Sequence, residues 1–209
     1  MQSGDKVFLI DGKGGFYEGQ IHSMKPWSVN VKITRAHENY GKRDCYLHIA
    51  IAPTKNTERF EWFIEKSTEI GIEEITPLLC HRSERKSLRI DRLEKILISA
   101  MKQSQNAFMP ILNRLTGFMN FIHECHDGNK YIAHCREDGK GIHLINTENI
   151  NRHFTILIGP EGDFTDEEIM AAENKGFISV NLGRNRLRTE TAGIVTCQVI
   201  ADWHASRSG

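Results

Sequence analysis

Residues 154–168 read FTILIGPEGDFTDEE, which joins a short apolar run, a glycine-rich turn and a helix start. The run 154–158 has the continuous apolar pattern of a strand that is buried on both faces. Thr165, with Glu168 three residues later, forms the capping-box pattern of a helix N-terminus. This stretch therefore predicts a strand, a tight turn and a helix, which is the repeating unit of an α/β fold.

The same unit recurs downstream. A second apolar run at 177–182 leads into LGRNRLRTETA at 182–192 and a helical pattern over 190–204. Ligands of open α/β sheets bind at the carboxyl ends of the strands, where glycines let them approach the backbone. Three arginines in the second loop can stack on a base or bond to carbonyl and phosphate oxygens. The two loops predict one shared pocket; the alternatives are a tight structural turn and a solvated basic loop.

The rest of the chain divides into a strand-rich start and an alternation of strands and helices. The start has expected strands at 6–11, 16–22, 29–34 and 46–52, with a hairpin turn at 12–15. After Pro53, helices are expected at 58–70, from Asp91 (paired with Glu94 as a starting box), at 118–122 and at 165–176, and strands at 72–80 and 131–134. The alternation predicts a mostly parallel sheet covered on both faces, with a domain boundary at 52–56.

Composition excludes several classes of protein. The 209 residues include 27 Lys and Arg and 27 Asp and Glu, so the formal net charge is 0. This balance excludes a polybasic coat protein and an acidic disordered tail, but a local basic face can still bind nucleic acid. The apolar runs are too short to span a bilayer, and the start lacks an apolar secretory core. A cytoplasmic location without membrane contact is expected.

The five cysteines form no C-x-x-C pair. A disulfide framework or a structural zinc site is therefore not expected. The densest group of possible metal ligands is His123, Cys125, His126, His134 and Cys135, and its spacing matches no zinc pattern. The alternative interpretation is buried cysteines and surface histidines, and the sequence predicts no metal site.

A basic segment at 81–92 reads HRSERKSLRIDR. It could contact the phosphates of RNA, or it could be a solvated face. The predicted RNA-binding residues combine this segment with the second loop: Arg82, Arg85, Lys86, Arg89, Arg184 and Arg186.

Gly159-Pro160-Glu161-Gly162 followed by Leu187-Arg188-Thr189-Glu190-Thr191-Ala192 resembles the signature of the RsmE family. The resemblance extends upstream to residues at first-helix positions and beyond: Lys55, Trp62, Lys66, Thr68, Glu69, Gly71, Arg82, Ser83, Gln103, Ser104 and Pro110. It covers nearly the whole chain, and the two loop motifs in this order are specific.

The resemblance implies the fold, the activity and the partners. RsmE proteins are SPOUT-class methyltransferases that use S-adenosyl-L-methionine to methylate N3 of one uridine in 16S ribosomal RNA, at the position conventionally numbered 1498. The implied architecture is a PUA-like, RNA-binding β-barrel at 1–52 and a SPOUT domain at 56–209 with a parallel sheet and a deep trefoil knot. A homodimer acting on the small ribosomal subunit, with no metal, is also implied.

The resemblance also assigns roles to residues. The expected cofactor-binding residues are Leu157, Ile158, Gly159, Pro160, Glu161, Gly162, Leu182, Gly183, Leu187, Arg188, Thr189, Thr191 and Ala192. Arg188 is the expected catalytic cation, because a positive charge near O2 or O4 stabilises a deprotonated uracil. Glu190, or alternatively Glu161, is expected to accept the N3 proton.

Two other classes of function stay open: a non-catalytic RNA-binding protein that keeps the fold, and an enzyme that uses a different nucleotide cofactor. The absence of G-x-G-x-x-G after any strand counts against the second. The chain also departs from the family pattern twice. The opening strand segment of the barrel is missing before Met1, so the barrel is expected to be incomplete. Asp163 stands where the family has a glycine, which adds a charge at the cofactor turn.

Overall fold

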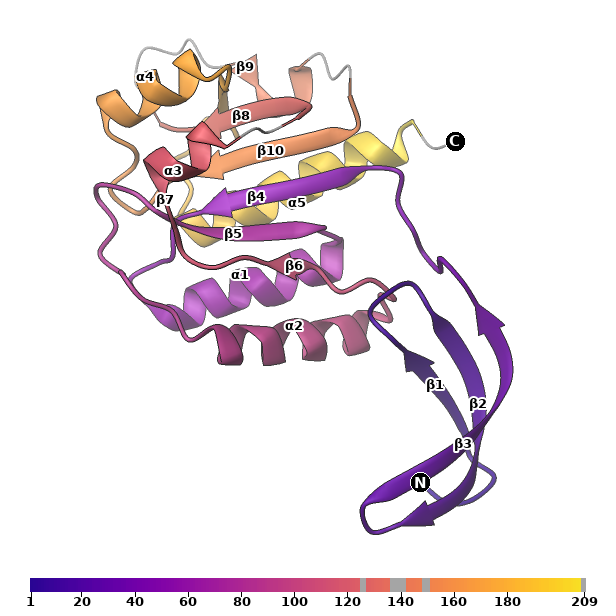
Figure 1. Ribbon diagram of the computed structural model, residues 1–209. Coiled ribbons are helices and arrows are strands. Elements are labelled where there is room, and N and C mark those ends of the chain that lie inside the picture. The colour runs from indigo at the N-terminus through magenta and orange to yellow at the C-terminus, as the bar shows by residue number, and fades with distance from the viewer. Residues whose placement is uncertain (125–126, 136–141, 148–150, 208–209) are drawn as a thin grey trace.

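The computed structural model describes residues 1–124, 127–135, 142–147 and 151–207. It contains a small antiparallel sheet at the N-terminus and a larger, parallel sheet flanked by helices. In Figure 1 the small sheet extends away from the parallel sheet, on the side of the amino ends of the parallel strands.

The small sheet is a meander of three strands: β1 (Lys6–Ile10), β2 (Phe16–Lys25) and β3 (Ser28–His37). Its order, β1-β2-β3, leaves β1 and β3 unpaired with each other, so these residues form an open sheet and not a closed barrel. The predicted hairpin turn at 12–15 is confirmed, and it is held against the larger unit. The amide of Gly14 donates to the carbonyl of Ala107 (2.8 Å), and the amide of Met109 donates to the carbonyl of Gly12 (2.9 Å).

The large sheet has the strand order β6-β5-β4-β10-β8-β11-β9, with β7 also pairing with β5. Every pairing in it is parallel. Its strands are β4 (Tyr46–Ile51), β5 (Glu74–Leu79), β6 (Ile111–Leu112), β7 (Thr116–Gly117), β8 (Asn129–Ala133), β9 (Ile142–His143), β10 (His153–Ile158) and β11 (Ile178–Asn181). The strand expected at 46–52 in the N-terminal unit is therefore misplaced: it is β4, which pairs with β5 and β10. Its apolar run suits a position buried on both faces.

Helices cover both faces of this sheet, as predicted (Figure 1). One face carries α1 (Thr57–Ile70), α2 (Ile90–Ser104) and α5 (Thr189–Ala205), and the other carries α3 (Phe118–His123) and α4 (Asp166–Asn174). Strand β4 shows how the sequence divides the two cores. Leu47, Ile49 and Ile51 pack with α1, α2 and α5, whereas Ala50 packs with α3 and α4. Alternate residues of a strand point to opposite faces, so small residues on one face leave room for the helices there.

The helix termini test the sequence signals directly. The Thr165–Glu168 capping box is confirmed, and so is Gly71 as the end of α1, with φ +111°. The starting box expected at Asp91 is wrong. Helix α2 begins at Ile90, and its N-cap residue, Arg89, makes no side-chain capping bond, so Asp91 lies inside the first turn. An acidic residue there still complements the helix dipole.

The trefoil knot implied by the resemblance stays a prediction.

None of the helices in the described ranges is long and apolar enough to cross a membrane.

Candidate functional site

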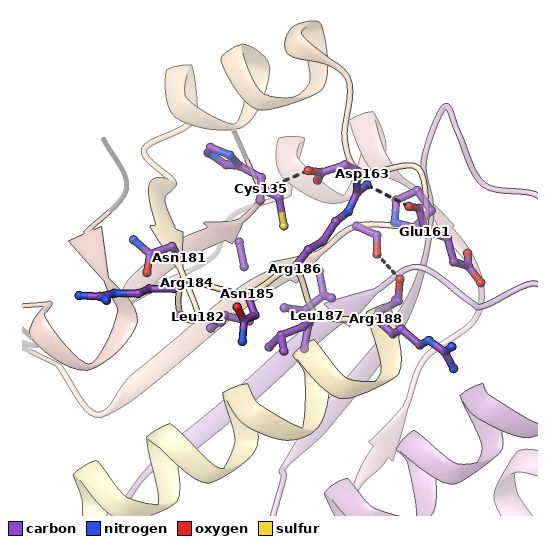
Figure 2. Close-up of a pocket in the computed structure, with 18 of the residues that line it drawn as sticks. Cys135, Glu161, Asp163, Asn181, Leu182, Arg184, Asn185, Arg186, Leu187 and Arg188 are labelled. Atoms are coloured by element: carbon purple, nitrogen blue, oxygen red, sulfur yellow. Dashed lines mark hydrogen bonds between the residues drawn. The ribbon is translucent and has the colours of Figure 1, made fainter. Parts of the chain in front are cut away.

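A pocket of about 780 Å³ lies at the carboxyl ends of β8, β10 and β11. Because parallel strands end at one edge of the sheet, the loops that follow them converge there. The pocket is lined by Ala133, His134, Cys135, His143, Ile158, Gly159, Pro160, Glu161, Asp163, Asn181, Leu182, Gly183, Arg184, Asn185, Arg186, Leu187, Arg188, Thr189 and Ala192. The two loops predicted to share a pocket do share one (Figure 2).

The loop after β10, residues 159–164, is held by hydrogen bonds. Asp163 has φ +63°, a left-handed conformation that side chains rarely adopt, and its amide donates to the carbonyl of Pro160 (2.9 Å). Its carboxylate accepts from the amide of Cys135 (2.9 Å) and from the amide of Phe164 (2.8 Å). Asp163 therefore satisfies a position that suits glycine and ties this loop to the end of β8.

Gly159 is required by packing. A Cβ built on it would lie 3.1 Å from the ring of Phe164, which is 3% exposed. The φ angle of Gly159 is not positive, so its backbone is not in the left-handed conformation. Its lack of a side chain therefore lets Phe164 fold under the turn.

The loop after β11, residues 183–188, is more open. Gly183 has φ +136°, and a Cβ built on it would meet no atom within 4 Å. Arg186 reaches across the pocket and donates through Nη2 to the carbonyl of Glu161 (3.3 Å). Thr189, at the start of α5, donates through its hydroxyl to the carbonyl of Gly159 (3.0 Å). These two bonds join the second loop to the first.

Arg188 is the N-cap residue of α5, and its side chain is exposed. Its guanidinium makes no hydrogen bond or ion pair with the described residues, although its backbone carbonyl accepts from the amide of Ala192 (2.8 Å). Figure 2 shows the guanidinium extending away from Arg184 and Cys135, at the opposite end of the second loop. A cation in this position is available to a second substrate at the rim of the pocket.

Ten of the thirteen predicted cofactor-binding residues line the pocket. The other three are Leu157, Gly162 and Thr191. Leu157 is fully buried in the core beneath α3 and α4. Gly162 faces Arg82, because a Cβ built on it would lie 3.3 Å from Cδ of that arginine.

Glu190, the predicted proton acceptor, is not among the residues that line the pocket. Its carboxylate is buried, with 8% of the side chain exposed, and its Oε1 lies 3.8 Å from Nε of Arg59 on α1. Its Oε2 has no hydrogen-bond partner among the described residues. The first turn of α5 directs this side chain toward α1, whereas Arg188, two residues earlier, stays at the rim. This placement favours the alternative proton acceptor, Glu161, because Glu161 lines the pocket.

The predicted RNA-binding residues separate into three groups. Arg184 and Arg186 line the pocket. Arg82 and Arg85 donate to backbone carbonyls of neighbouring loops. Lys86 and Arg89 are exposed, and the Arg89 side chain has only a long contact with Asp91 (3.4 Å) within the part of the chain that the structure describes.

Sequence reasoning missed the third wall of the pocket, which is the end of β8: Ala133, His134 and Cys135. The strand was predicted, and the rule that placed the other two loops at the carboxyl edge applies to it as well. What the sequence did not show is that β8 lies between β10 and β11. Asn181 at the end of β11, Asn185 in the second loop and His143 on β9 also line the pocket and were not predicted.

The described cysteines differ in exposure. Burial raises the pKa of the Cys45 thiol to about 11 and raises the pKa of Cys80 and Cys197 as well. Cys135 is exposed at the pocket. The pKa of its thiol is raised mainly by partial burial and to a smaller extent by the negative charge of Asp163. Among the described residues no three His, Cys, Asp or Glu side chains form a metal-binding group, and Cys125 and His126 lie outside those residues.

Comparison with known proteins identifies the family. Residues 42–201, more than half of the chain, match the model of the RNA methyltransferase domain. The chain is 29% identical over 192 residues to the ribosomal RNA small subunit methyltransferase E of Rickettsia conorii. The matched region covers 91% of this chain and 78% of that protein. This chain belongs to the RsmE family of RNA methyltransferases.

Solved structures agree with the family and the fold. A crystal structure of a probable rRNA methyltransferase from Porphyromonas gingivalis superposes with a TM-score of 0.92 at 38% identity, covering 99% of this chain and 87% of that one. A methyltransferase Lpg2936 of Legionella pneumophila, in complex with S-adenosylmethionine, gives a TM-score of 0.86 at 28% identity over 97% and 85% of the chains. The predicted α/β fold of the SPOUT type is confirmed, and an antiparallel sheet of three strands stands where an incomplete barrel was expected.

Proposed function

We propose that this protein transfers the methyl group of S-adenosylmethionine to N3 of a uridine in 16S ribosomal RNA. The observation that carries the proposal is the single pocket into which both signature loops and the end of β8 project. Its size is within the range of about 300–1,000 Å³ that is usual for small-molecule sites. The named activity of the relatives supports the reaction class and the ribosomal substrate.

The residues of the pocket fit S-adenosylmethionine. Ile158, Leu182, Leu187 and Ala192 provide apolar walls, and the exposed polar backbone of the two loops can bond to an adenine edge and to a ribose. Gly183 keeps open the space that a Cβ would fill. Glu161 and Asp163 line the same pocket, and their negative charges suit a ligand that carries a sulfonium and an ammonium group.

The bound cofactor supplies an electrophilic methyl group on a sulfonium. N3 of uracil carries a proton, so the base must lose that proton as the new bond forms. The guanidinium of Arg188, which is exposed at the rim and has no partner among the described residues, is placed to stabilise the negative charge that develops on the uracil carbonyls. This charge exists mainly in the transition state, so Arg188 acts on the rate more than on binding.

We propose that Glu161 accepts the proton that N3 of uracil loses. It lines the pocket, and its Oε1 already accepts from the amide of Lys55 (2.9 Å), which fixes the carboxylate and leaves Oε2 for the base or for a water molecule. Glu190 instead faces Arg59 and supports the start of α5.

Two measurements test the proposed function. Calorimetry with S-adenosylmethionine should show binding with one site per chain. Small ribosomal subunits from a strain that lacks the modification should then gain one methyl group at a uridine N3. A protein that binds RNA but not the cofactor would instead be a non-catalytic member that keeps the fold. A methyl group transferred to another base or atom would retain the class of enzyme and reject the uridine.

We also propose a homodimer, as the family resemblance implies. Light scattering coupled to size-exclusion chromatography should give twice the 23.9 kDa mass of the chain. A monomer that binds the cofactor and methylates RNA would reject this part alone.

A further inference from the structure

The basic segment at 81–92 contains cations in two different situations. Arg82 donates through Nη1 to the carbonyl of Gly162 (2.8 Å) and, over 3.3 Å, to the carbonyl of Phe164. Arg89 is exposed, as Arg82 is, but among the described residues its side chain pairs only with Asp91, in the first turn of α2. Residues that look alike in the sequence therefore have different neighbours.

Arg82 binds the loop after β10 and is not among the residues that line the pocket. The two carbonyls that it holds flank Asp163, whose carboxylate accepts from the amide of Cys135. The aliphatic stem of Arg82 also packs on the backbone, since a Cβ on Gly162 would lie 3.3 Å from Cδ and 3.4 Å from Cβ of the arginine. The loop is thus held from two directions, by the end of β8 and by the segment after β5.

Arg85 extends the same arrangement to the loop after β4. Its Nε donates to the carbonyl of Thr54 (3.1 Å), and its Nη2 donates to the carbonyl of Lys55 (2.6 Å). The amide of Lys55 in turn donates to Oε1 of Glu161 (2.9 Å). Arg85 therefore holds the peptide that holds Glu161, a residue of the pocket.

Glu168 adds a third connection. Its Oε1 accepts from the amide of His81 (2.8 Å), while its Oε2 accepts from the amide of Thr165 within the capping box. One carboxylate thus joins the start of the basic segment to the start of α4. Three separate loops at the carboxyl edge of the sheet are linked by these side chains.

We propose that Arg82 and Arg85 are positioning residues of the cofactor pocket and not phosphate ligands of the RNA. Nη1 of Arg82 and both Nε and Nη2 of Arg85 donate to carbonyl oxygens, and a phosphate that took these donors would release the loops they hold. The exposed Lys86 and Arg89 of the same segment are the cations left for RNA. This inference rests on the proposed function, since it assumes that the pocket binds S-adenosylmethionine.

The decisive comparison is Arg82→Ala against Arg89→Ala, two arginine truncations in one segment. We expect Arg82→Ala to raise the Kd for S-adenosylmethionine about tenfold, because small displacements of positioning groups have large effects. Arg89→Ala should leave that Kd unchanged. In RNA binding measured against salt concentration, Arg89→Ala should flatten the slope by about one counterion, and Arg82→Ala should keep the wild-type slope.

Two further measurements separate positioning from general stability. Arg82→Lys keeps one donor group and should recover part of the cofactor affinity. Arg85→Ala should raise KM for the cofactor more than it lowers kcat. Wild-type cofactor affinity in Arg82→Ala, or a flattened salt slope in that variant, overturns the inference. A loss of affinity matched by a large fall in Tm and not relieved by lysine overturns it too. If the wild-type protein itself binds no S-adenosylmethionine, the proposed function fails first.

Discussion

The two loops that face the pocket are built differently. The loop after β10 is fixed by its own contacts: Asp163 bonds to Cys135 on one side, and Arg82 bonds to two carbonyls on the other. The loop after β11 has a glycine with φ +136° and exposed arginines, and Arg186 and Thr189 connect it to the first loop. Both loops follow a strand and include a glycine, yet the first is bonded to the end of β8 and to the segment after β5, whereas the second is bonded to the first loop.

This difference predicts that the first loop positions the cofactor and that the second loop interacts with the second substrate. A loop held on both sides presents fixed backbone groups, so it can define where a cofactor sits without ordering cost on binding. A loop with free cations can respond to a second substrate and place charge where the reaction develops it. Changes in the first loop should therefore affect stability and cofactor binding, and changes in the second should affect the rate and RNA binding.

The largest expected effect is in the second loop. Arg188→Ala should lower the single-turnover methylation rate about a hundredfold, or roughly 3 kcal/mol of barrier, because the cation is needed most in the transition state. Cofactor affinity should change little. Arg188→Lys should recover part of the rate, since an ammonium keeps the charge but loses the planar fork.

Single-turnover methylation at saturating RNA and cofactor measures this effect, with calorimetry as the control. A near-normal rate would remove Arg188 from the chemistry. A joint loss of rate, cofactor affinity and Tm would show that Arg188 holds its loop in place, and the two loops would then be alike.

A matched pair of glycines gives the next largest effect. Gly183→Ala should weaken cofactor binding about tenfold with little change in Tm, because the strained φ and the new methyl group affect an exposed loop. Gly159→Ala should lower Tm by a few degrees, since its Cβ would press on the buried ring of Phe164. Calorimetry and thermal unfolding of both variants measure the pair. Equal losses of Tm would contradict the contrast between the loops.

Much of the fold follows from local sequence signals. The capping box at Thr165 and the stop at Gly71 each come from one short stretch, and the structure confirms them. Strand order does not follow, because periodicity says which face of a strand is buried and not which strand lies beside it. The resulting errors are the assignment of β4 to the N-terminal unit and the omission of β8 from the pocket.

The site shows the same limit. Both glycine loops were found because turn and strand signals are local. Arg82 and Arg85 were predicted to bind RNA because a basic run looks the same in the sequence whether its donors face carbonyls or water, and the structure shows donors of both facing carbonyls. Glu190 was placed in the chemistry by its motif, but the helical rotation of the first turn of α5 directs it to Arg59. Such directions depend on tertiary contacts.

A smaller effect should separate the arginines that face RNA. Arg184 lines the pocket, is exposed and has no hydrogen bond or ion pair with the described residues. Arg184→Ala should weaken RNA binding about threefold to tenfold at low salt and reduce the salt slope by about one counterion. Filter binding or fluorescence anisotropy at several salt concentrations measures it. An unchanged slope would mean that Arg184 is solvated in the complex, and the second loop would then not supply cations to the RNA.

The smallest expected effect is on the reactivity of Cys135. Its exposed thiol lies at the pocket, and its amide donates to Asp163 in the first loop. Partial burial and then the Asp163 carboxylate raise the pKa of the thiol, so alkylation should be slow at neutral pH and accelerate as pH rises, because the thiolate is the nucleophile.

Alkylation of a Cys125→Ser variant tests this prediction, because the other cysteines, Cys45, Cys80 and Cys197, are buried and should react only on unfolding. Saturating S-adenosylmethionine should slow labelling of Cys135 about threefold by covering the pocket wall, as a ligand protects the state that it binds. Asp163→Asn should speed labelling without the cofactor for two reasons. It removes the negative charge beside the thiol, and it removes one of the two carboxylate oxygens that accept from the amides of Cys135 and Phe164. Equal labelling rates with and without the cofactor would place its site away from the end of β8. The wall that fixes the first loop would then have no part in binding.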